Sequence, residues 1–267
     1  MPVWTLFGLQ RGKATIDWPF AGDQDGQEGL CGMPRHDPAR CAPDCEACAV
    51  VCLPGAIRID PGPARTVQVD YGRCIVCQLC IEACPEGAFT RSSDWAFGVR
   101  RRDDLVWQEA LASEPGRQLP GKIQKVFGRS LHVRHVDAGS CNGCESELQA
   151  LNNPFYNLHR LGIFFTASPR AADLLLVTGP ITYAMRGPLL EAYRAMPEPH
   201  WVMAMGTCAV SGGVVADGYA CGRGLDGVLP VDLYLPGCPP NPAAMIDALL
   251  MLLGRAPQRV QGGHLGN

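Results

Sequence analysis

The stretch Cys74-Ile-Val-Cys77-Gln-Leu-Cys80-Ile-Glu-Ala-Cys84-Pro85 has the spacing Cys-x2-Cys-x2-Cys-x3-Cys-Pro. This is the bacterial run whose thiolates hold a [4Fe–4S] cluster. Its first three cysteines lie on one short loop and can bind three corners of a cubane. In proteins that carry two clusters, the fourth cysteine ligates the other one. The run therefore predicts a second run elsewhere in the chain.

A second run is present upstream, and it reads Cys41-Ala-Pro-Asp-Cys45-Glu-Ala-Cys48-Ala-Val-Val-Cys52-Leu-Pro54. A shift of 32 positions places its last three cysteines on those of the first run, so we expect two half-units that pack face to face. Three residues rather than two separate Cys41 from Cys45, and we interpret Cys41 as a ligand on a loop with one inserted residue. The expected first set is Cys41, Cys45, Cys48 and Cys84, and the expected second set is Cys52, Cys74, Cys77 and Cys80.

Disulfide bonds and zinc sites are the alternatives for these cysteines. Fourteen cysteines in 267 residues are about 5% of the chain, below the roughly 8–10% typical of a disulfide scaffold. No secretory signal is predicted at the start of the sequence. Structural zinc sites commonly use two Cys pairs separated by a longer spacer. We therefore favour iron–sulfur binding for both runs.

Four further cysteines follow predicted strands in the second half of the chain. The motif Cys141-Asn-Gly-Cys144 comes after the apolar stretch 131–136, and Cys208 and Cys238 each end another such stretch. Loops at the carboxyl ends of parallel strands converge in one crevice, so these four thiols can meet in a third set, Cys141, Cys144, Cys208 and Cys238. Dispersed cysteines are also often small buried hydrophobic residues, and we assign Cys31 and Cys221 to that class.

The length of the chain predicts two domains. We expect residues 1–118 to form a bacterial-type two-cluster ferredoxin domain that ends in a linker from residue 92, where Arg100–Arg102 form a solvated turn. We expect residues 119–267 to form an α/β domain with a doubly wound, flavodoxin-like parallel sheet, because apolar strands and helices alternate there. The expected strands are 66–71, 131–136, 163–166, 174–178, 201–205 and 231–235, and the expected helices are 145–151, 185–196 and 242–254.

Composition excludes two other classes of protein. No run of 18 or more apolar residues occurs, so no membrane-spanning helix is predicted. The net charge of −3 provides no basic footprint for nucleic acid. The first part is too small for a large core, so its clusters should also stabilise its fold. The glycine-rich tail after Arg255 is expected to be loose.

Several motifs in the second half resemble one known family. They are Asp137-Ala-Gly-Ser-Cys141-Asn-Gly-Cys144-Glu145, Ser168-Pro-Arg-Ala-Ala-Asp173-Leu-Leu-Leu-Val-Thr-Gly179, Gly206-Thr-Cys208 with Ser211-Gly-Gly213, and Pro236-Gly-Cys238-Pro-Pro240. In combination they resemble the small subunit of energy-converting (group 4) NiFe hydrogenases of the formate hydrogenlyase or hydrogenase-4 type, which is homologous to the terminal-cluster subunit of complex I. The resemblance covers about residues 122–254 and implies that the third set holds a [4Fe–4S] cluster.

The first half resembles the two-cluster ferredoxin-like subunit of the same complexes. The residues concerned are Gly12-Lys-Ala-Thr-Ile-Asp-Trp-Pro-Phe20, Gly32-Met-Pro34 and Gly72-Arg-Cys74-Ile-Val-Cys77. These subunits are usually separate polypeptides, whereas here they are fused. Complex I versions have two adjacent cysteines in place of Cys141-x2-Cys144, which favours the hydrogenase side. Formate hydrogenlyase types have an extra cysteine where this chain has Ala138, a position that is not needed as a ligand.

The resemblance implies an oxidoreductase subunit that is not catalytic alone and that carries three [4Fe–4S] clusters. Its expected partners are a NiFe large subunit, membrane-arm subunits, and an electron donor such as a formate dehydrogenase or ferredoxin. Because no twin-arginine signal opens the chain, we expect a cytoplasmic protein on the inner face of the inner membrane. Two alternatives stay open: a complex-I-like module that passes electrons to quinone or another carrier without nickel, and a zinc-stabilised scaffold.

Other polar residues near the third set have two interpretations. Glu145 and Glu147 lie in the first turn of an expected helix, where acidic side chains stabilise the helix dipole. We prefer that interpretation for Glu147, whereas for Glu145 a proton relay toward the partner is an equal alternative. The histidines His132, His135 and His159 are expected to pack or to lie on the surface, and Met203 and Met205 are expected in the core.

Overall fold

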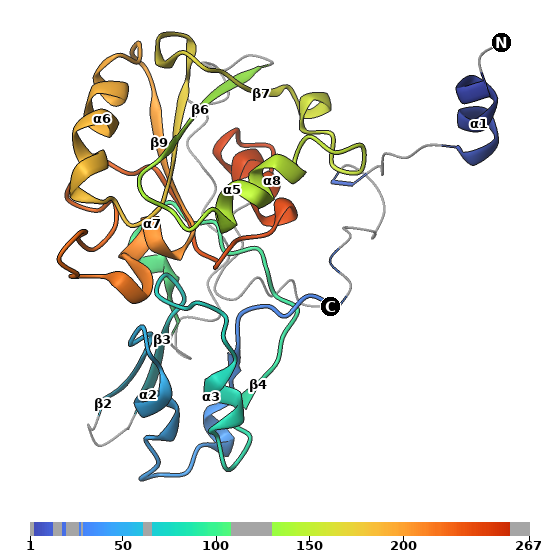
Figure 1. Cartoon of the computed structure of the whole chain (residues 1–267). Helices are drawn as coiled ribbons and strands as arrows, with labels where there is room; N and C mark the ends of the chain where they lie inside the picture. The colour runs from blue at the N-terminus through green and yellow to red at the C-terminus, as the bar shows by residue number, and fades with distance from the viewer. Residues whose placement is uncertain are drawn as a thin grey trace.

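The computed structural model describes residues 3–12, 18–19, 27, 29–60, 66–107 and 130–256. The predicted domain boundary between residues 118 and 119 and most of the tail after Arg255 lie outside these residues. Figure 1 shows an α/β unit above a smaller unit that contains both cysteine runs.

A five-stranded parallel sheet forms the centre of the α/β unit, as predicted. Its strand order is β10-β9-β8-β6-β7, and every neighbouring pair is parallel. Numbered along this unit, that order is the 2-1-3-4-5 order of flavodoxin-like folds. The chain reverses direction across the sheet between β6 and β8, where such folds bind their ligands. The strands are β6 (Leu131–Asp137), β7 (Ile163–Phe165), β8 (Leu174–Thr178), β9 (Trp201–Met205) and β10 (Leu233–Leu235).

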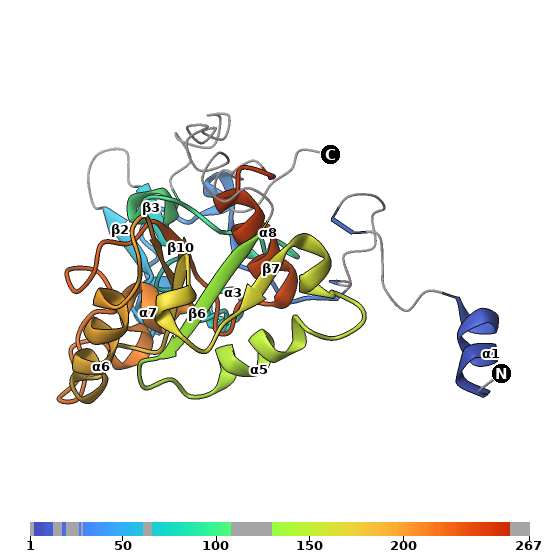
Figure 2. The ribbon, with the colours of Figure 1, turned by 90° about the horizontal axis from the view of Figure 1, so that it is seen from above.

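Both faces of this sheet are buried. Leu174 and Leu176 of β8 face one hydrophobic cluster, whereas Leu175 and Val177 face another, as the two-residue period of a strand requires. Such a strand is apolar on both sides, which explains the continuous apolar run in the sequence. One face is covered by α5 (Gly143–Ala150) and α8 (Pro242–Leu252), and the other by α6 (Tyr183–Arg194), α7 (Thr207–Ser211) and part of the smaller unit (Figure 2).

Helix α8 is the central helix of the first face. The Asn241 side chain accepts a hydrogen bond of 2.7 Å from the Ala244 amide, and Pro242 occupies the first helical position. All of its residues except Asp247 are buried, as expected for a helix that is apolar on every side. It also contacts the smaller unit. The main chain at Gly98 passes so close to α8 that a Cβ atom there would lie 2.9 Å from the Ala248 Cβ.

The smaller unit consists of two short antiparallel sheets and two helices. The helices α2 and α3 contact each other, and each lies within one cysteine run, so the two half-units pack together as predicted (Figure 1). The sheets are β1-β4 and β2-β3-β5. The elements are β1 (Arg35–His36), α2 (Ala47–Val51), β2 (Ile57–Asp60), β3 (Thr66–Asp70), α3 (Leu79–Glu82), β4 (Phe89–Thr90) and β5 (Val106–Trp107).

The segment 92–107 differs from the predicted linker with a solvated arginine turn. Val106 and Trp107 pair with β3, so this segment completes a sheet of the smaller unit. Val99 forms two backbone hydrogen bonds with Tyr234 of β10, at 2.9 and 2.8 Å. Arg102 forms an ion pair with Asp70 instead of facing solvent. The prediction was wrong for Arg102 and for the backbone of residues 92–107, because nonlocal pairing orders a segment whose charges resemble a surface turn. Arg101 is exposed, as a solvated turn requires, and residues 108–118 of the predicted linker lie outside the described residues.

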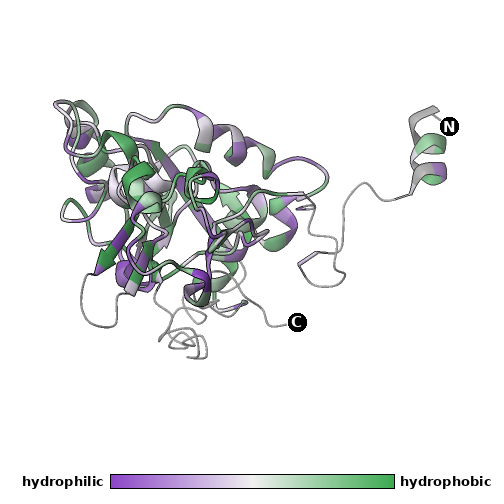
Figure 3. Cartoon of the chain, turned by 90° about the horizontal axis from the view of Figure 1, so that it is seen from below, coloured by the Kyte–Doolittle hydropathy of each residue, from purple (hydrophilic) through white to green (hydrophobic). Residues whose placement is uncertain are grey.

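The remaining elements are short, apart from one helix. Helix α1 (Val3–Arg11) stands away from the other elements (Figure 3). The apolar side chains of Leu6, Phe7 and Leu9 in this helix are exposed. None of the helices in the described ranges is long and apolar enough to cross a lipid bilayer. The 3-10 turns are Pro38–Arg40, Arg102–Leu105, Leu158–Leu161, Pro169–Ala171 and Gly213–Val215.

Candidate metal centre

The loop between β6 and α5 carries the first two thiols of the third set. The Asp137 carboxylate accepts hydrogen bonds from the amides of Gly139 at 2.8 Å and Ser140 at 2.7 Å, which folds the chain into a tight turn. Asn142, in the left-handed conformation with φ of 70°, precedes the first residue of α5. Cys141 therefore lies on the loop and Cys144 in the first turn of the helix.

The other two thiols follow the neighbouring strands β9 and β10. Cys208 lies in α7, directly after β9, and Cys238 lies three residues after the end of β10. Gly206 has a φ of 86°, and a Cβ atom there would lie only 2.6 Å from the Cys144 sulfur. The loop after β9 can therefore approach Cys144 only because residue 206 has no side chain.

The four thiols of the third set lie within electrostatic reach of one another. Burial, followed by the charges of Cys238 and Cys141, raises the pKa of the Cys208 thiol to about 11. Burial is also the main cause that raises the pKa of Cys144, followed by Glu145 and then by the other three cysteines. The structure thus brings together all four residues that the sequence assigned to this set.

Glu145 is 9% exposed and lies in a polar network beside the third set. Ser140 donates a hydrogen bond of 2.6 Å to one carboxylate oxygen, and the Thr178 hydroxyl donates to the other. His135 is 3.5 Å from that second oxygen and 2.9 Å from the Thr178 hydroxyl. His135 is therefore a partner of this carboxylate, a role that its position in the sequence does not indicate. Burial lowers the pKa of His135, whereas Glu145 acts in the opposite direction.

The first set surrounds a small cavity in the smaller unit. The cavity is lined by Cys41, Cys45, Cys48 and Cys84, together with Pro85, Ala88, Phe89, Ala42 and Glu86. Burial raises the pKa of Cys48 to about 11, and Cys41 and Cys45 contribute through their charges. Cys84 thus lies with the upstream run and not with its own, as the ferredoxin pattern predicts.

The thiols of the second set also lie close enough together to affect one another's pKa. Burial raises the pKa of Cys74 to about 12, with further contributions from Cys80, Cys52 and Cys77. Burial raises the pKa of Cys80 to about 12 as well, with Cys52 as its strongest charged neighbour and Cys48 also contributing. The fourth cysteine of each run, Cys52 or Cys84, therefore lies with the first three cysteines of the other run.

The backbone around Cys41 matches that around Cys74 in detail. The Cys41 amide donates to the Pro38 carbonyl at 3.1 Å, and the Cys74 amide donates to the Tyr71 carbonyl at 3.2 Å. Asp37 accepts a hydrogen bond from the amide two residues later, and Asp70 does the same. These equivalent residues are 33 positions apart, one more than the 32 of the later cysteines, so the extra residue lies between Cys41 and Cys45.

Main-chain amides also point at the sulfur atoms in a repeated pattern. The Ala56 amide donates to the Cys52 sulfur at 3.2 Å, and the Ala88 amide donates to the Cys84 sulfur at 3.2 Å. The intervening glycines, Gly55 and Gly87, have φ values of 60° and 61°. An amide hydrogen bond stabilises a thiolate and tunes the potential of a cluster that it holds.

The two remaining cysteines differ from each other. Cys221 is buried, as predicted, and its thiol donates to the Val215 carbonyl at 3.1 Å. Cys31 is exposed, so the prediction that it is a buried hydrophobic residue was wrong. It precedes Gly32, whose main chain packs against Asp94, and its own side chain remains on the surface. An isolated cysteine in a sequence carries no signal of its burial.

The residues of the three sets fit iron–sulfur groups. Thiolates are soft ligands for iron, and the positive charge of bound metal offsets the burial that raises these pKa values. A single zinc ion would need four sulfurs about 2.3 Å from one point. Within the described part of the chain, no three histidine, cysteine or acidic side chains are arranged to hold a single metal ion.

Two family models match this chain. Residues 141–252 match the family described as NADH ubiquinone oxidoreductase, 20 Kd subunit, and residues 40–88 match the 4Fe–4S dicluster domain. The first match covers the cysteines of the third set, and the second covers both cysteine runs. The unit with the parallel sheet and the unit with the repeat thus each have a family of their own.

Individual proteins are similar to the chain as well. Formate hydrogenlyase subunit 7 of Escherichia coli is 43% identical over 156 residues, which are 58% of this chain and 59% of that protein. An uncharacterized protein of Methanocaldococcus jannaschii is 45% identical over 128 residues, 48% of this chain and 86% of that protein. A probable membrane-bound hydrogenase subunit of Pyrococcus furiosus is 39% identical over 141 residues, 53% and 84% of the two chains.

Among solved structures, the chain is similar to one in the membrane-bound sulfane sulfur reductase, an archaeal respiratory membrane complex. The identity is 33% and the TM-score is 0.44, with 51% of this chain and 77% of that chain covered.

Proposed function

The chain belongs to the family of iron–sulfur electron-transfer subunits that membrane-bound hydrogenases share with NADH–ubiquinone oxidoreductases, and on this basis we propose its specific role. It carries three [4Fe–4S] clusters and relays electrons between a donor and the NiFe site of a partner large subunit. The ligands are the three cysteine sets: Cys41, Cys45, Cys48 and Cys84; Cys52, Cys74, Cys77 and Cys80; and Cys141, Cys144, Cys208 and Cys238.

One observation carries this proposal. Twelve of the fourteen cysteines gather into three groups of four, and the smaller unit packs directly against the sheet that holds the third group. Packing in one shared core keeps the second and third sets at a fixed separation. A fixed separation is the requirement for an electron relay, because the transfer rate depends on it steeply.

Each group of residues has a defined task. A bound cluster supplies reversible one-electron storage. The thiolates hold it, and the amides of Ala56 and Ala88 donate to two of the sulfurs. Gly206 allows the main chain to approach the Cys144 sulfur closely, and Gly55 and Gly87 adopt the left-handed conformation at the turns after Cys52 and Cys84. Glu145, held by Ser140 and Thr178, lies beside the third set, where it stabilises the helix dipole or exchanges protons with the partner.

The expected complex follows from the names of the relatives. Formate hydrogenlyase and membrane-bound hydrogenase suggest a NiFe large subunit next to the third set, membrane-arm subunits below it, and a donor such as a formate dehydrogenase or ferredoxin at the smaller unit. The chain itself would then sit peripherally on the cytoplasmic face of the inner membrane.

The test is the iron and cluster content of protein purified without oxygen. We expect about twelve irons per chain, broad visible absorbance, and electron paramagnetic resonance (EPR) signals of three cubanes on reduction. About eight irons would remove the third cluster from the proposal, and stoichiometric zinc in place of iron would overturn it.

A second function is supported by the match to the 20 Kd subunit family. In that case the large subunit lacks nickel, and electrons pass to quinone or another carrier. The spacing Cys141-x2-Cys144 favours the hydrogenase role. The sequence of the co-purifying large subunit discriminates between the two, because a nickel site requires two Cys-x2-Cys motifs near its ends.

A further inference from the structure

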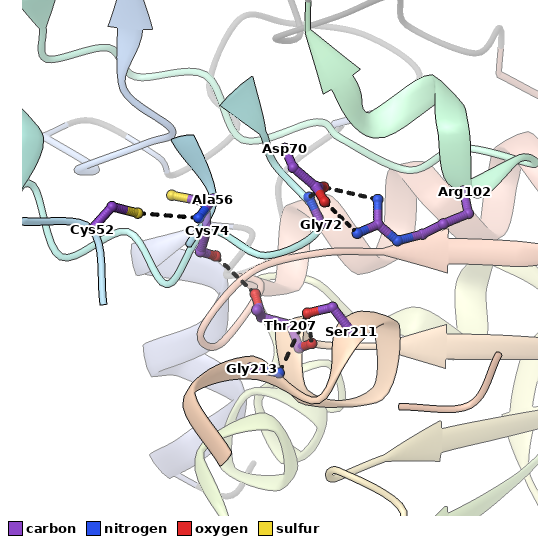
Figure 4. Close-up of polar contacts among 9 residues, drawn as sticks. All are labelled: Cys52, Ala56, Asp70, Gly72, Cys74, Arg102, Thr207, Ser211 and Gly213. Carbon is purple, nitrogen blue, oxygen red and sulfur yellow. Dashed lines mark hydrogen bonds and ion pairs between the residues drawn. The ribbon is translucent and has the colours of Figure 1, made fainter. Parts of the chain in front are cut away.

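Thr207 connects the second and third sets through its hydroxyl group. The hydroxyl donates a hydrogen bond of 2.9 Å to the main-chain carbonyl of Cys74, a member of the second set (Figure 4). It also accepts a bond of 3.3 Å from the Gly237 amide, which directly precedes Cys238. Thr207 itself directly precedes Cys208, so a single hydroxyl touches the backbone next to two thiols of the third set and that of one thiol of the second set.

The surroundings hold this hydroxyl in place. Thr207 is 1% exposed, which excludes competing water. Its amide donates to the Gly237 carbonyl at 2.8 Å, so the loops of Cys208 and Cys238 are joined by two hydrogen bonds. The Thr207 carbonyl accepts from the Ser211 hydroxyl at 3.1 Å, within α7 (Figure 4). The side chain is therefore fixed on both sides of the contact between the two units.

We propose that Thr207 is a positioning residue that couples the second set to the third electronically. The proposal rests on the proposed function, because it requires an electron to pass between these two sets. With clusters bound, the group held by the second set would lose one electron and the group held by the third set would gain it, and no bond to a heavy atom would form or break. The route runs from the Cys74 thiolate through its own main chain, across the hydroxyl, and into the main chain of Cys208 or Cys238.

The hydroxyl matters because electrons couple more strongly through a chain of bonds than through a gap between atoms that only touch. Electronic coupling falls far less across a covalent or hydrogen-bonded link than across a van der Waals gap of the same length. Without the hydroxyl, the Cys74 carbonyl and the Gly237 amide lose a shared partner in a buried place. Valine is close to threonine in shape but can form neither hydrogen bond, so Thr207→Val removes the hydroxyl with little change in side-chain volume.

The experiment uses the complete, cluster-loaded protein and compares Thr207→Val with Thr207→Ser. A low-potential one-electron donor such as photoreduced deazaflavin starts the reaction, and rapid-freeze EPR follows the reduction of the third set. We expect Thr207→Val to slow this step several-fold while iron content and the reduction potentials stay at wild-type values, and Thr207→Ser to retain the wild-type rate. Thr166→Val, placed after the edge strand β7, is the matched control and should change nothing.

A second readout does not depend on electron transfer. Hydrogen–deuterium exchange at the Gly237 amide should accelerate in Thr207→Val and stay slow in Thr207→Ser. If the valine variant transfers electrons at the wild-type rate, or if the serine variant is equally slow, the proposal is overturned. If the valine variant loses iron, Thr207→Ala replaces it, and loss of iron there too would assign Thr207 a purely structural role and overturn the coupling. A wild-type protein without a third cluster would instead contradict the proposed function.

Discussion

Arg102 and Asp70 form a bidentate ion pair in which the two guanidinium nitrogens lie 2.8 and 2.7 Å from the two carboxylate oxygens (Figure 4). Asp70 also accepts a hydrogen bond of 2.9 Å from the Gly72 amide, at the turn that leads into Cys74. A side chain on Gly72 would collide with the guanidinium, since its Cβ would lie 2.5 Å from the central carbon of that group. This pair therefore joins the segment 92–107 to the loop that opens the second set.

Breaking this ion pair should destabilise the smaller unit. The two side chains are 20% and 16% exposed, so Arg102→Ala leaves a largely buried carboxylate without its partner. We expect a loss of about 3 kcal/mol in the free energy of unfolding, the lower end for a buried pair because part of it is exposed. Urea unfolding under anaerobic conditions measures it. The control Arg101→Ala breaks an exposed pair with Asp103 and should cost less than about 1 kcal/mol. Equal losses in both variants would contradict the assignment.

A methyl group at position 206 should disrupt the third set alone. Gly206→Ala places a carbon atom 2.6 Å from the Cys144 sulfur, at a φ of 86° that alanine rarely adopts. We expect iron to fall from about twelve to about eight per chain, with both signals of the smaller unit intact. Gly187→Ala is the matched control, since nothing lies within 4 Å of its Cβ position in α6, and it should retain full iron.

The irregular cysteine at the start of the upstream run should be a ligand. Cys41→Ser replaces a thiolate by a poorer ligand at the cavity of the first set, so we expect a weakened or three-iron cluster there and an altered EPR spectrum. Cys31→Ser alters an exposed cysteine outside the three sets and should leave the spectrum unchanged. If the first cluster is unaltered in Cys41→Ser, Cys41 is not a ligand and another residue must take that role.

Removing one thiol of the third set should stop electron transfer to the partner without affecting the first and second sets. Cys141→Ser is expected to abolish electron transfer to the partner while the signals of the first and second sets persist. The reason is that Cys141 belongs to the β6–α5 loop and contributes to neither set of the smaller unit. EPR on the anaerobic variant measures this outcome. Loss of all three signals would show that the two units do not hold their clusters independently.

The half-buried imidazole of His135 beside Glu145 should make the stability depend on pH. Burial lowers the pKa of His135 despite the opposing charges of Glu145 and Asp137, and Arg134 lowers it further. The folded protein then binds this proton more weakly than the unfolded chain, so the stability is present above the unfolded pKa of about 6.5 and is lost as the pH falls below it. The urea midpoint should decline in that range, and His135→Gln should reduce the decline. His159→Gln, on the surface beside Phe164, should leave the decline as in the wild type.

The accuracy of the sequence-based predictions depended on how local the relevant interactions are. The strands 174–178 and 201–205 match β8 and β9, because buried parallel strands are continuous apolar runs. The grouping of Cys84 with the upstream run followed from the known ferredoxin spacing. The role of residues 92–107 was missed, since pairing with β3 and Tyr234 leaves no periodic pattern in a charged segment.

The amino-acid order alone was sufficient to predict the kind of metal group, the internal repeat and the parallel sheet. Each of these depends on spacing within a few residues, or on a period that local backbone geometry imposes. The fold itself was needed to show that Cys141 and Cys238 lie close enough to Cys208 to raise its pKa, that His135 faces Glu145, and that the Thr207 hydroxyl reaches Cys74 across 133 positions. Contacts of that kind arise only when separate elements pack, because no local preference of the chain encodes which distant residue will lie opposite.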